Sequence, residues 1–369
     1  MLRLLPFALG YAYSYLLRSA GAPLAAPMAQ DLGLSSGALG VLNALFFLAF
    51  AGAQVPMGYL LERWGPSRTL GALLALAALG CGLVAAAPGL GLLALGRLAM
   101  GAGVALALVG ALRAYQLLAP GRLGFLSGLT VALGGLGGLL STWPLVRLGE
   151  AWGWRGVYGA LGLLALGLAL WVRGIPTGGR PRGAGGGRGL APGAFLPLAL
   201  VSGVYVGGFF ALQSFWVGAY AYAQGLAGDE VGGLLALLNL ASVLGAFASG
   251  GLAAAWGTGR ALAVGVGVFA LGLLAWGMRA DLALAYALLG LGGGFNGLVL
   301  AHTAGLFREA SSRAMAWVNL VGVLGIFSLQ AGMGLVVEAL GYGAALLGLG
   351  LLQVLALAVL WRAASRPLP

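Results

Sequence analysis

The stretch GYLLERWGPSR, residues 58–68, places Glu62, Arg63 and Arg68 in a chain that otherwise consists mostly of leucine, alanine, glycine and valine. A second stretch, GGLAAAWGTGR at 250–260, repeats it 192 residues later. Five positions coincide in the two copies: Gly58/Gly250, Leu60/Leu252, Trp64/Trp256, Gly65/Gly257 and Arg68/Arg260. The repeat predicts that the chain contains a duplicated unit, with one copy of this loop in each half.

The composition is that of an integral membrane protein. Of the 369 residues, 61% are hydrophobic and only 7% are charged, and the mean hydropathy is +1.02. A soluble domain usually carries about 25% charged residues. Because a spanning helix needs ~20 apolar residues, this length accommodates about a dozen spans with short connections.

Apolar runs between charge and turn signals predict an all-α membrane protein with twelve transmembrane helices. Their approximate bounds are 4–28, 37–60, 68–88, 90–113, 122–145, 155–173, 194–221, 231–255, 260–278, 282–306, 314–337 and 343–361. The glycine-, proline- and arginine-rich stretch between the sixth and seventh spans predicts a flexible linker. We therefore expect two pseudo-symmetric six-helix bundles, residues 1–173 and 194–369, joined by a cytoplasmic linker at 174–193.

The arginines predict the orientation of these spans. With both termini in the cytoplasm, the outer loops hold only Arg147, Arg155 and Arg279, while Arg18 and Arg97 lie within spans. The other fourteen arginines fall on the inner side: Arg3, Arg63, Arg68, Arg113, Arg122, Arg173, Arg180, Arg182, Arg188, Arg260, Arg308, Arg313, Arg362 and Arg366. Because cytoplasmic loops are enriched in arginine and lysine, the net charge of +11 reads as a topology signal, and nucleic acid is not an expected partner.

Several classes of function are excluded. Cys81 is the only cysteine and the chain contains no lysine, so neither a disulfide framework, a thiolate metal site nor a phosphate-binding lysine loop is expected. The glycine run LGGLGG at 133–138 follows no strand and is better explained by helix packing. We expect no enzymatic activity, no cofactor and no metal.

Four motifs resemble the major facilitator superfamily. GYLLERWGPSR is similar to its cytoplasmic signature, with Glu62 where the family usually has aspartate. The stretches 31–58, GRLAMGAG at 96–103 and GWRGVY at 153–158 resemble its first outer loop with the second helix, its fourth-helix motif and the start of its sixth helix. The resemblance covers the whole chain and implies alternating access, in which two bundles rock around a central cavity.

Arg18 is the main candidate for substrate binding. A charge in mid-span is costly and usually functional, and Tyr11, Ser14, Tyr15 and Arg18 share one face of the first helix. A guanidinium suits a carboxylate or phosphate, although a latch between helices is the alternative. Further candidates are Gln213 and Trp216 on the seventh span and the amides Asn296 and Asn319, which we expect to be buried.

A second set of residues is expected to control conformation. By resemblance, Glu62 reaches the start of the eleventh helix near Ser311 and Ser312, with Arg113 as a partner, when the cytoplasmic side is closed. Arg97 either couples protons or braces helices, and GGGFNG at 292–297 predicts a bend in the tenth helix. The gating candidates are Gly58, Glu62, Arg63, Gly65, Arg68, Arg97, Arg113, Gly250, Gly257 and Arg260.

The leading interpretation is a secondary transporter for a small anionic or zwitterionic metabolite, such as an organic acid, a phosphorylated metabolite or an amino acid. The seventh span carries no arginine, so a clamp of two arginines is not predicted. The alternatives are efflux of lipophilic drugs or lipids and, in another class, a non-transporting scramblase or sensor. The expected partners are the substrate, a coupling proton or sodium ion, and the bilayer of a prokaryotic inner membrane, which the chain crosses as a multi-pass monomer.

Overall fold

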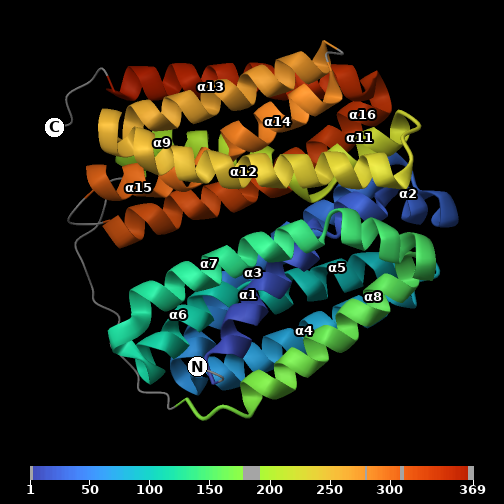
Figure 1. Ribbon diagram of the computed structural model, residues 1–369, viewed down its shortest axis with the longest axis vertical. Helices are drawn as coiled ribbons and strands as arrows, with labels where there is room; N and C mark the ends of the chain where they lie inside the picture. Colours follow the sequence, from blue (N-terminus) through green and yellow to red (C-terminus); the bar gives the residue numbers. More distant parts are fainter. Residues whose placement is uncertain (1–2, 178–191, 279–280, 308–310, 365–369) are drawn as a thin grey trace. The chain divides into compact units, whose positions relative to one another are not determined.

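The computed structural model describes residues 3–177, 192–278, 281–307 and 311–364, and this part of the chain is helical without a strand (Figure 1). It forms two compact units. Unit 1 comprises Met1–Ala184 together with Ala221–Gly232, and unit 2 comprises Gly185–Tyr220 together with Gly233–Pro369. The segment Ala221–Gly232 therefore packs with unit 1, although the chain on either side of it belongs to unit 2.

Unit 1 is built from eight helices and a short 3₁₀ turn, Pro120–Arg122, within the described chain. The helices are α1 (Leu5–Ser19), α2 (Gly21–Leu32), α3 (Ser36–Trp64), α4 (Pro66–Ala85), α5 (Leu90–Val104), α6 (Ala107–Leu118), α7 (Leu123–Leu140) and α8 (Trp143–Arg173).

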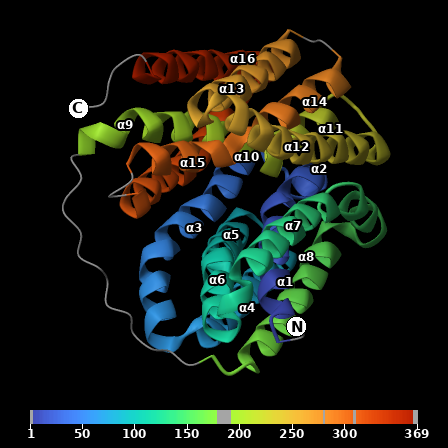
Figure 2. The same cartoon turned by 60° about the vertical axis from the view of Figure 1, so that its left-hand side comes forward.

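The helices after the linker begin with α9 (Pro192–Val201), α10 (Gly207–Ala211) and α11 (Val217–Ala223), which two π-helical turns, Ser202–Val206 and Leu212–Trp216, join into one continuous span. The remaining helices are α12 (Gly228–Trp256), α13 (Thr258–Gly277), α14 (Leu282–Gly293), α15 (Gly297–Leu306) and α16 (Ser311–Ala364). Within unit 2, α13 packs beside α14 and α16 (Figure 2).

Nine helical stretches in the described residues are long and apolar enough to cross a membrane. The predicted span 4–28 is divided into α1 and α2, which are each too short to count, and 314–337 and 343–361 run together in α16. The span 122–145 corresponds to a shorter apolar helix, Gly128–Leu140. The all-helical membrane class is confirmed, whereas the count of twelve and the orientation stay predictions.

Four glycines with positive φ join consecutive helices directly. Gly65 (φ 79°) separates α3 from α4, and Gly257 (φ 84°) separates α12 from α13. Gly153 (φ 68°) and Gly341 (φ 82°) form sharp kinks inside α8 and α16. Their ψ values all lie between 155° and 170°, a backbone region that is essentially restricted to glycine.

The residues before these glycines reveal more copies of the loop than the two found from the sequence. The tetrapeptides that end at the four glycines are ERWG (62–65), EAWG (150–153), AAWG (254–257) and EALG (338–341). The same backbone turn and related residues occur twice in each half of the chain. Each half is therefore itself a repeat, as in the transporters whose six-helix halves consist of two three-helix repeats.

Each of the four three-helix repeats contains one of these glycine turns. The first membrane span of each repeat departs from a regular α-helix. The α-helical hydrogen-bond pattern changes at Ala20 between α1 and α2, at 105–106 between α5 and α6, at the two π-helical turns, and at the 3₁₀ turn Gly294–Asn296 between α14 and α15. The glycine cluster at 292–297 thus coincides with a 3₁₀ turn, whereas the bend expected there stays a prediction. Interrupted helices expose backbone groups inside the membrane, where transporters use them to bind substrates and ions.

Glycines also allow close contact between helices. In unit 1, a Cβ on Gly137 of α7 would collide with the backbone carbonyl of Ala12 in α1, and a Cβ on Gly101 would collide with that of Phe46. In unit 2, Gly245 lies equally close to Leu291. The LGGLGG run is accordingly a packing surface, as expected for small residues between membrane helices.

Candidate functional site

Arg18 lies in the last turn of α1, next to the break at Ala20. Its side chain is half-buried, and its Cζ atom is 4.7 Å from the ring centroid of Tyr15 and 5.1 Å from that of Phe50 in α3. A cation over an aromatic face gains ~0.5–2 kcal/mol, and the most when it is desolvated. The guanidinium is thus held by two aromatic rings at a break in mid-span. Phe50 is not predictable as a partner from the sequence, because nothing local connects it with Arg18.

The rest of the predicted polar face of α1 is used partly for packing. Tyr11 is 9% exposed, contacts Tyr15 edge to face at 5.2 Å, and lies against Gly134 of α7. The Ser14 hydroxyl donates a hydrogen bond to the carbonyl of Tyr11 at 2.8 Å. Tyr15 and Arg18 are the partly accessible members of this face.

Three of the four candidates in unit 2 lie at helix interruptions. Gln213 and Trp216 belong to the second π-helical turn, and Asn296 belongs to the 3₁₀ turn. Gln213 Nε2 donates to Asn239 Oδ1 at 2.9 Å, and Trp216 Nε1 donates to the carbonyl of Gln330 at 3.3 Å. Asn296 Nδ2 donates to the carbonyl of Gly293 at 2.9 Å.

The expectation that Asn319 is buried is wrong, because its side chain is exposed on α16. Two glutamines of α16 that the sequence analysis overlooked are instead fully buried. Gln353 Nε2 donates to the carbonyl of Val204 in the first π-helical turn at 2.9 Å. Neither polar side-chain atom of Gln330 has a hydrogen-bond partner among the described residues. A glutamine inside an apolar span is the signal that would have identified both residues.

Arg97 is buried in the core of unit 1, where it is 2% exposed. Its Cζ atom lies 5.4 Å from the ring centroid of Tyr158 in α8, and it forms no ion pair within the described chain. Beside it, the Tyr13 hydroxyl contacts Cys81 Sγ at 3.4 Å and donates to the carbonyl of Leu161 at 3.2 Å. This arrangement links α1, α4, α5 and α8, and the choice between proton coupling and bracing for Arg97 stays a prediction.

Two hydrogen bonds between threonine side chains and backbone groups hold the loop that carries the signature. Thr177 Oγ1 accepts a hydrogen bond from the backbone N–H of Ser67 at 3.0 Å, and Thr69 Oγ1 donates to the carbonyl of Leu60 at 3.2 Å. A Cβ on Gly58 or Gly250 would meet no atom within 4 Å, so neither glycine is needed for close packing in this structure.

The charged residues of this loop are available for other contacts. Glu62, Arg63 and Arg68 are exposed and form no ion pair with any described residue, and Arg260 of the second copy is in the same situation. Arg113 donates to Gln116 Oε1 at 3.2 Å. The side chains of Ser311 and Ser312, the expected partners of Glu62, lie outside the described ones. The inner latch therefore stays a prediction.

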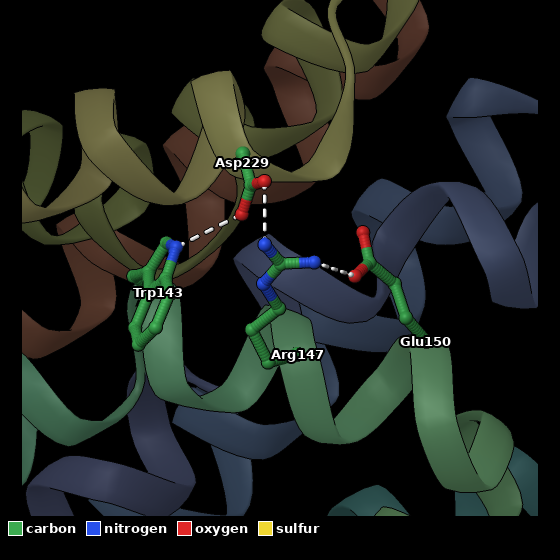
Figure 3. Close-up of polar contacts among 4 residues, drawn as sticks. All are labelled: Trp143, Arg147, Glu150 and Asp229. Carbon is green, nitrogen blue, oxygen red and sulfur yellow. Dashed lines mark hydrogen bonds and ion pairs between the residues drawn. The ribbon is translucent and has the colours of Figure 1, made fainter.

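A charged cluster that the sequence analysis did not anticipate joins Ala221–Gly232 to the rest of unit 1 (Figure 3). Arg147 Nη2 lies 2.6 Å from Asp229 Oδ2, and Arg147 Nη1 lies 3.2 Å from Glu150 Oε2. Trp143 Nε1 donates to the other oxygen of Asp229 at 2.9 Å. The Tyr222 hydroxyl adds a hydrogen bond to the carbonyl of Pro23 at 3.1 Å.

A third ion pair, between Asp31 and Arg155, joins the end of α2 to α8 within unit 1. Trp154 Nε1 donates to Asp31 Oδ2 at 3.1 Å, and Arg155 Nη2 donates to the carbonyl of Ala87 at 3.0 Å. The hydrogen bond from Arg155 lowers the pKa of the Asp31 carboxyl below its usual value. All three ion pairs among the described residues thus involve Arg147 or Arg155, two of the arginines that the sequence places on the outer side.

Comparisons with known proteins agree with this architecture. Residues 7–276 match the model of the Major Facilitator Superfamily. No curated protein sequence matches the chain.

Among solved structures, the chain resembles a bacterial homologue of the human lysosomal transporter Spinster, in an inward-facing and occupied conformation. The TM-score is 0.78 at 16% identity, over 98% of this chain and 96% of that one. It also resembles the nucleoside transporter NupG (TM-score 0.79, 12% identity, 100% of both chains). A third similar structure is a D-xylose–proton symporter (TM-score 0.78, 14% identity, 97% of this chain and 96% of that one). At these identities the likeness concerns the fold.

Proposed function

The chain belongs to the major facilitator superfamily, whose members are secondary transporters, and we propose that its substrate is a small anionic or zwitterionic metabolite. The observation that carries this proposal is the position of Arg18. A half-buried guanidinium lies at a break in a membrane helix and is held over the rings of Tyr15 and Phe50. The interiors of the predicted spans contain no aspartate or glutamate, so the fixed charge available there is positive.

The surroundings of Arg18 suit an anion with an apolar or aromatic part. Guanidinium offers a planar set of donors that matches a carboxylate or phosphate. The aromatic rings beside it hold the side chain in place, which reduces the rotamer entropy lost on binding. Within unit 2, Gln330 of α16 is a buried neutral amide whose donor and acceptor are both unused among the described residues.

The coupling of substrate transport to a proton that we propose does not require a buried carboxylate. The only histidine, His302, lies in α15, where its Nδ1 atom is 2.9 Å from Thr258 Oγ1. We propose exchange, uniport or symport in which the substrate itself carries the proton. One of the similar structures is described as a proton symporter, and proton coupling of this chain can be tested directly.

Two charged sites, one at Glu62 and one at Arg147, are proposed to control access to the substrate site. Glu62 in the signature loop would stabilise the state that is closed on the cytoplasmic side, as an acidic group near a helix N-terminus does. The cluster of Arg147, Glu150 and Asp229 would stabilise the state in which Ala221–Gly232 is held on unit 1. Because each of these contacts must break when the protein changes state, each is expected to be only moderately stable.

A ligand-binding screen tests the proposal. Purified wild-type protein is tested by thermal shift against small carboxylates, phosphates and amino acids, because a ligand present at 100 times its Kd stabilises the folded state by about 2.7 kcal/mol. We expect a subset of anions to raise the melting temperature of the wild type and of Arg3→Ala, in which an exposed arginine near the N-terminus is replaced. Arg18→Ala should fold but lose the shift.

The variant Arg18→Lys separates charge from shape. It keeps the positive charge but loses the planar set of donors, so we expect it to bind the same anions more weakly than the wild type. The same ligand affinity in Arg18→Ala as in the wild type would refute the role of Arg18. Shifts produced by hydrophobic cations, and by no anion, would favour efflux of lipophilic compounds instead.

A further inference from the structure

Unit 2 contains a cavity of about 490 Å³ that the proposed transport function does not use. This volume lies within the range of ~300–1,000 Å³ that is usual for ligand sites. None of the proposed substrate-binding residues contributes to it. Its walls come from α13, α15 and the C-terminal part of α16, and it is lined by Gly259, Arg260, Ala263, His302, Val354, Leu357, Ala358 and Leu360.

The polar groups of the cavity are suited to a negative charge. Arg260 is exposed in the first turn of α13 and forms no ion pair with a described residue. His302 is half-buried, and its Nδ1 atom is bonded to Thr258 Oγ1 at 2.9 Å. The start of a helix adds a partial positive charge to that of the arginine. These groups come from α13 and α15, and no acidic side chain of the described residues lines the cavity.

The imidazole of His302 lies directly over Gly259. A Cβ on this residue would be 3.0 Å from Cε1 and 3.3 Å from Nε2 of the ring. Because Gly259 has no side chain, the ring can rest on the first turn of α13 next to Arg260. A donor and a cation therefore line the same cavity.

The remainder of the cavity is apolar. Ala263, Val354, Leu357 and Leu360 form a hydrocarbon wall, and Val354 is 45% exposed. The neighbouring Leu351 and Leu355 are each 61% exposed on the same helix. Both α13 and this part of α16 belong to the stretches that are able to cross a membrane. An exposed apolar wall on such helices is the surface that acyl chains cover.

We propose that this cavity binds an anionic phospholipid, with the headgroup phosphate on Arg260 and His302 and one acyl chain along the apolar wall. A free phosphate would occupy only the polar part and leave the apolar wall without a partner. The arginine distribution predicts that this end of α13 faces the cytoplasm, where a basic residue near the surface gains ~1 kcal/mol from anionic lipids. The site shares no residue with the proposed substrate-binding set, although Arg260 is also one of the gating candidates.

Native mass spectrometry of the full-length protein in detergent tests this site. The protein is titrated with phosphatidylglycerol or with phosphatidylcholine of the same acyl chains. We expect the wild type to bind one phosphatidylglycerol more tightly than phosphatidylcholine. Arg260→Gln should weaken phosphatidylglycerol binding about fivefold, which corresponds to ~1 kcal/mol. The matched control is Arg68→Gln, which removes the equivalent arginine of the other copy and should bind as the wild type does.

A second variant tests the apolar wall without changing the charge. Leu357→Trp fills the cavity and should weaken the binding of both lipids. Inorganic phosphate in large excess should not displace the bound lipid. The proposal is overturned if Arg260→Gln and Arg68→Gln bind equally, if Leu357→Trp leaves the affinity unchanged, or if phosphate alone competes.

Discussion

The ion pair between Arg147 and Asp229 predicts how firmly Ala221–Gly232 is held on unit 1. This segment is continuous at both ends with unit 2, so its attachment depends on contacts such as this pair and the hydrogen bond from Tyr222 to Pro23. We expect Asp229→Asn to increase the fraction of molecules in which the segment is released. The substitution keeps an acceptor for Trp143 Nε1 and removes only the charge.

The size of the effect follows from the exposure of the pair. The two side chains are 50% and 52% exposed and the closest atoms are 2.6 Å apart. Exposed ion pairs contribute ~0.2–1 kcal/mol. The short distance and the shared hydrogen bond from Trp143 place this pair in the upper half of that range. A loss of ~0.5–1 kcal/mol raises the released fraction about two- to fivefold.

A buried cysteine reports the released fraction. Val146 is 2% exposed, and a Cβ on Gly228 would lie 3.0 Å from its Cγ1 atom, so the segment covers this position. In a Val146→Cys protein, the rate of labelling by a thiol reagent follows the population of the open form when opening is fast. The only native cysteine, Cys81, is fully buried and gives a low background. We expect labelling to be two- to fivefold faster with Asp229→Asn.

Glu230→Gln is the matched control, because it removes a neighbouring negative charge that accepts a hydrogen bond from Ala227 and forms no ion pair with a described residue. Equal labelling rates for Asp229→Asn and Glu230→Gln would refute the reasoning.

Three further predictions concern the glycine turns, the ion pair between Asp31 and Arg155, and the inner latch. Gly65→Ala and Gly257→Ala should each destabilise the protein by about 1–3 kcal/mol, because both glycines have a positive φ. Gly58→Ala is the control and should leave the melting temperature nearly unchanged, because its Cβ would meet no atom within 4 Å. Similar melting temperatures for all three variants would contradict this. A carboxyl with a lowered pKa stabilises the fold above its unfolded pKa of about 3.9 and loses this contribution as the pH falls through its folded value. Asp31→Asn should therefore lower the melting temperature at pH 7, and the difference from the wild type should vanish in strong acid; a difference that is independent of pH would argue against the ion pair. Glu62→Gln should shift the population towards the inward-facing state, measured with accessibility probes on the cytoplasmic side, and equal accessibility in both proteins would count against the latch.

Much of the fold was predictable from local sequence. The apolar composition indicates the membrane class, and the loops at 58–68 and 250–260 reveal the duplication, because tryptophan, glycine and arginine recur at the same spacing. Gly65 and Gly257 have nearly the same backbone conformation, as a repeated turn requires. The 3₁₀ turn at Gly294–Asn296 follows from the cluster of glycines, which have a low helix propensity.

Other features depend on contacts between distant residues. The turns at Gly153 and Gly341 share only short patterns with the signature, and these are recognisable once the backbone is known. The π-helical turns have no local signal, and the aromatic partner of Arg18 comes from a different helix. The pair between Arg147 and Asp229 joins residues 82 positions apart. Asn319, Gln330 and Gln353 are all amides of α16, so an amide in an apolar span marks a candidate but does not show which face of the helix it occupies.

The four glycine turns also have a consequence for insertions and deletions. Each turn connects two long helices through one residue, so no loop absorbs a change in length. One additional residue before Gly65 would rotate α4 by about 100° and shift it by about 1.5 Å relative to α3. Such a change would move Thr69 away from the carbonyl of Leu60 and Gly71 away from α8. We therefore expect related chains to differ in length at other connections and to keep the spacing constant across these four turns.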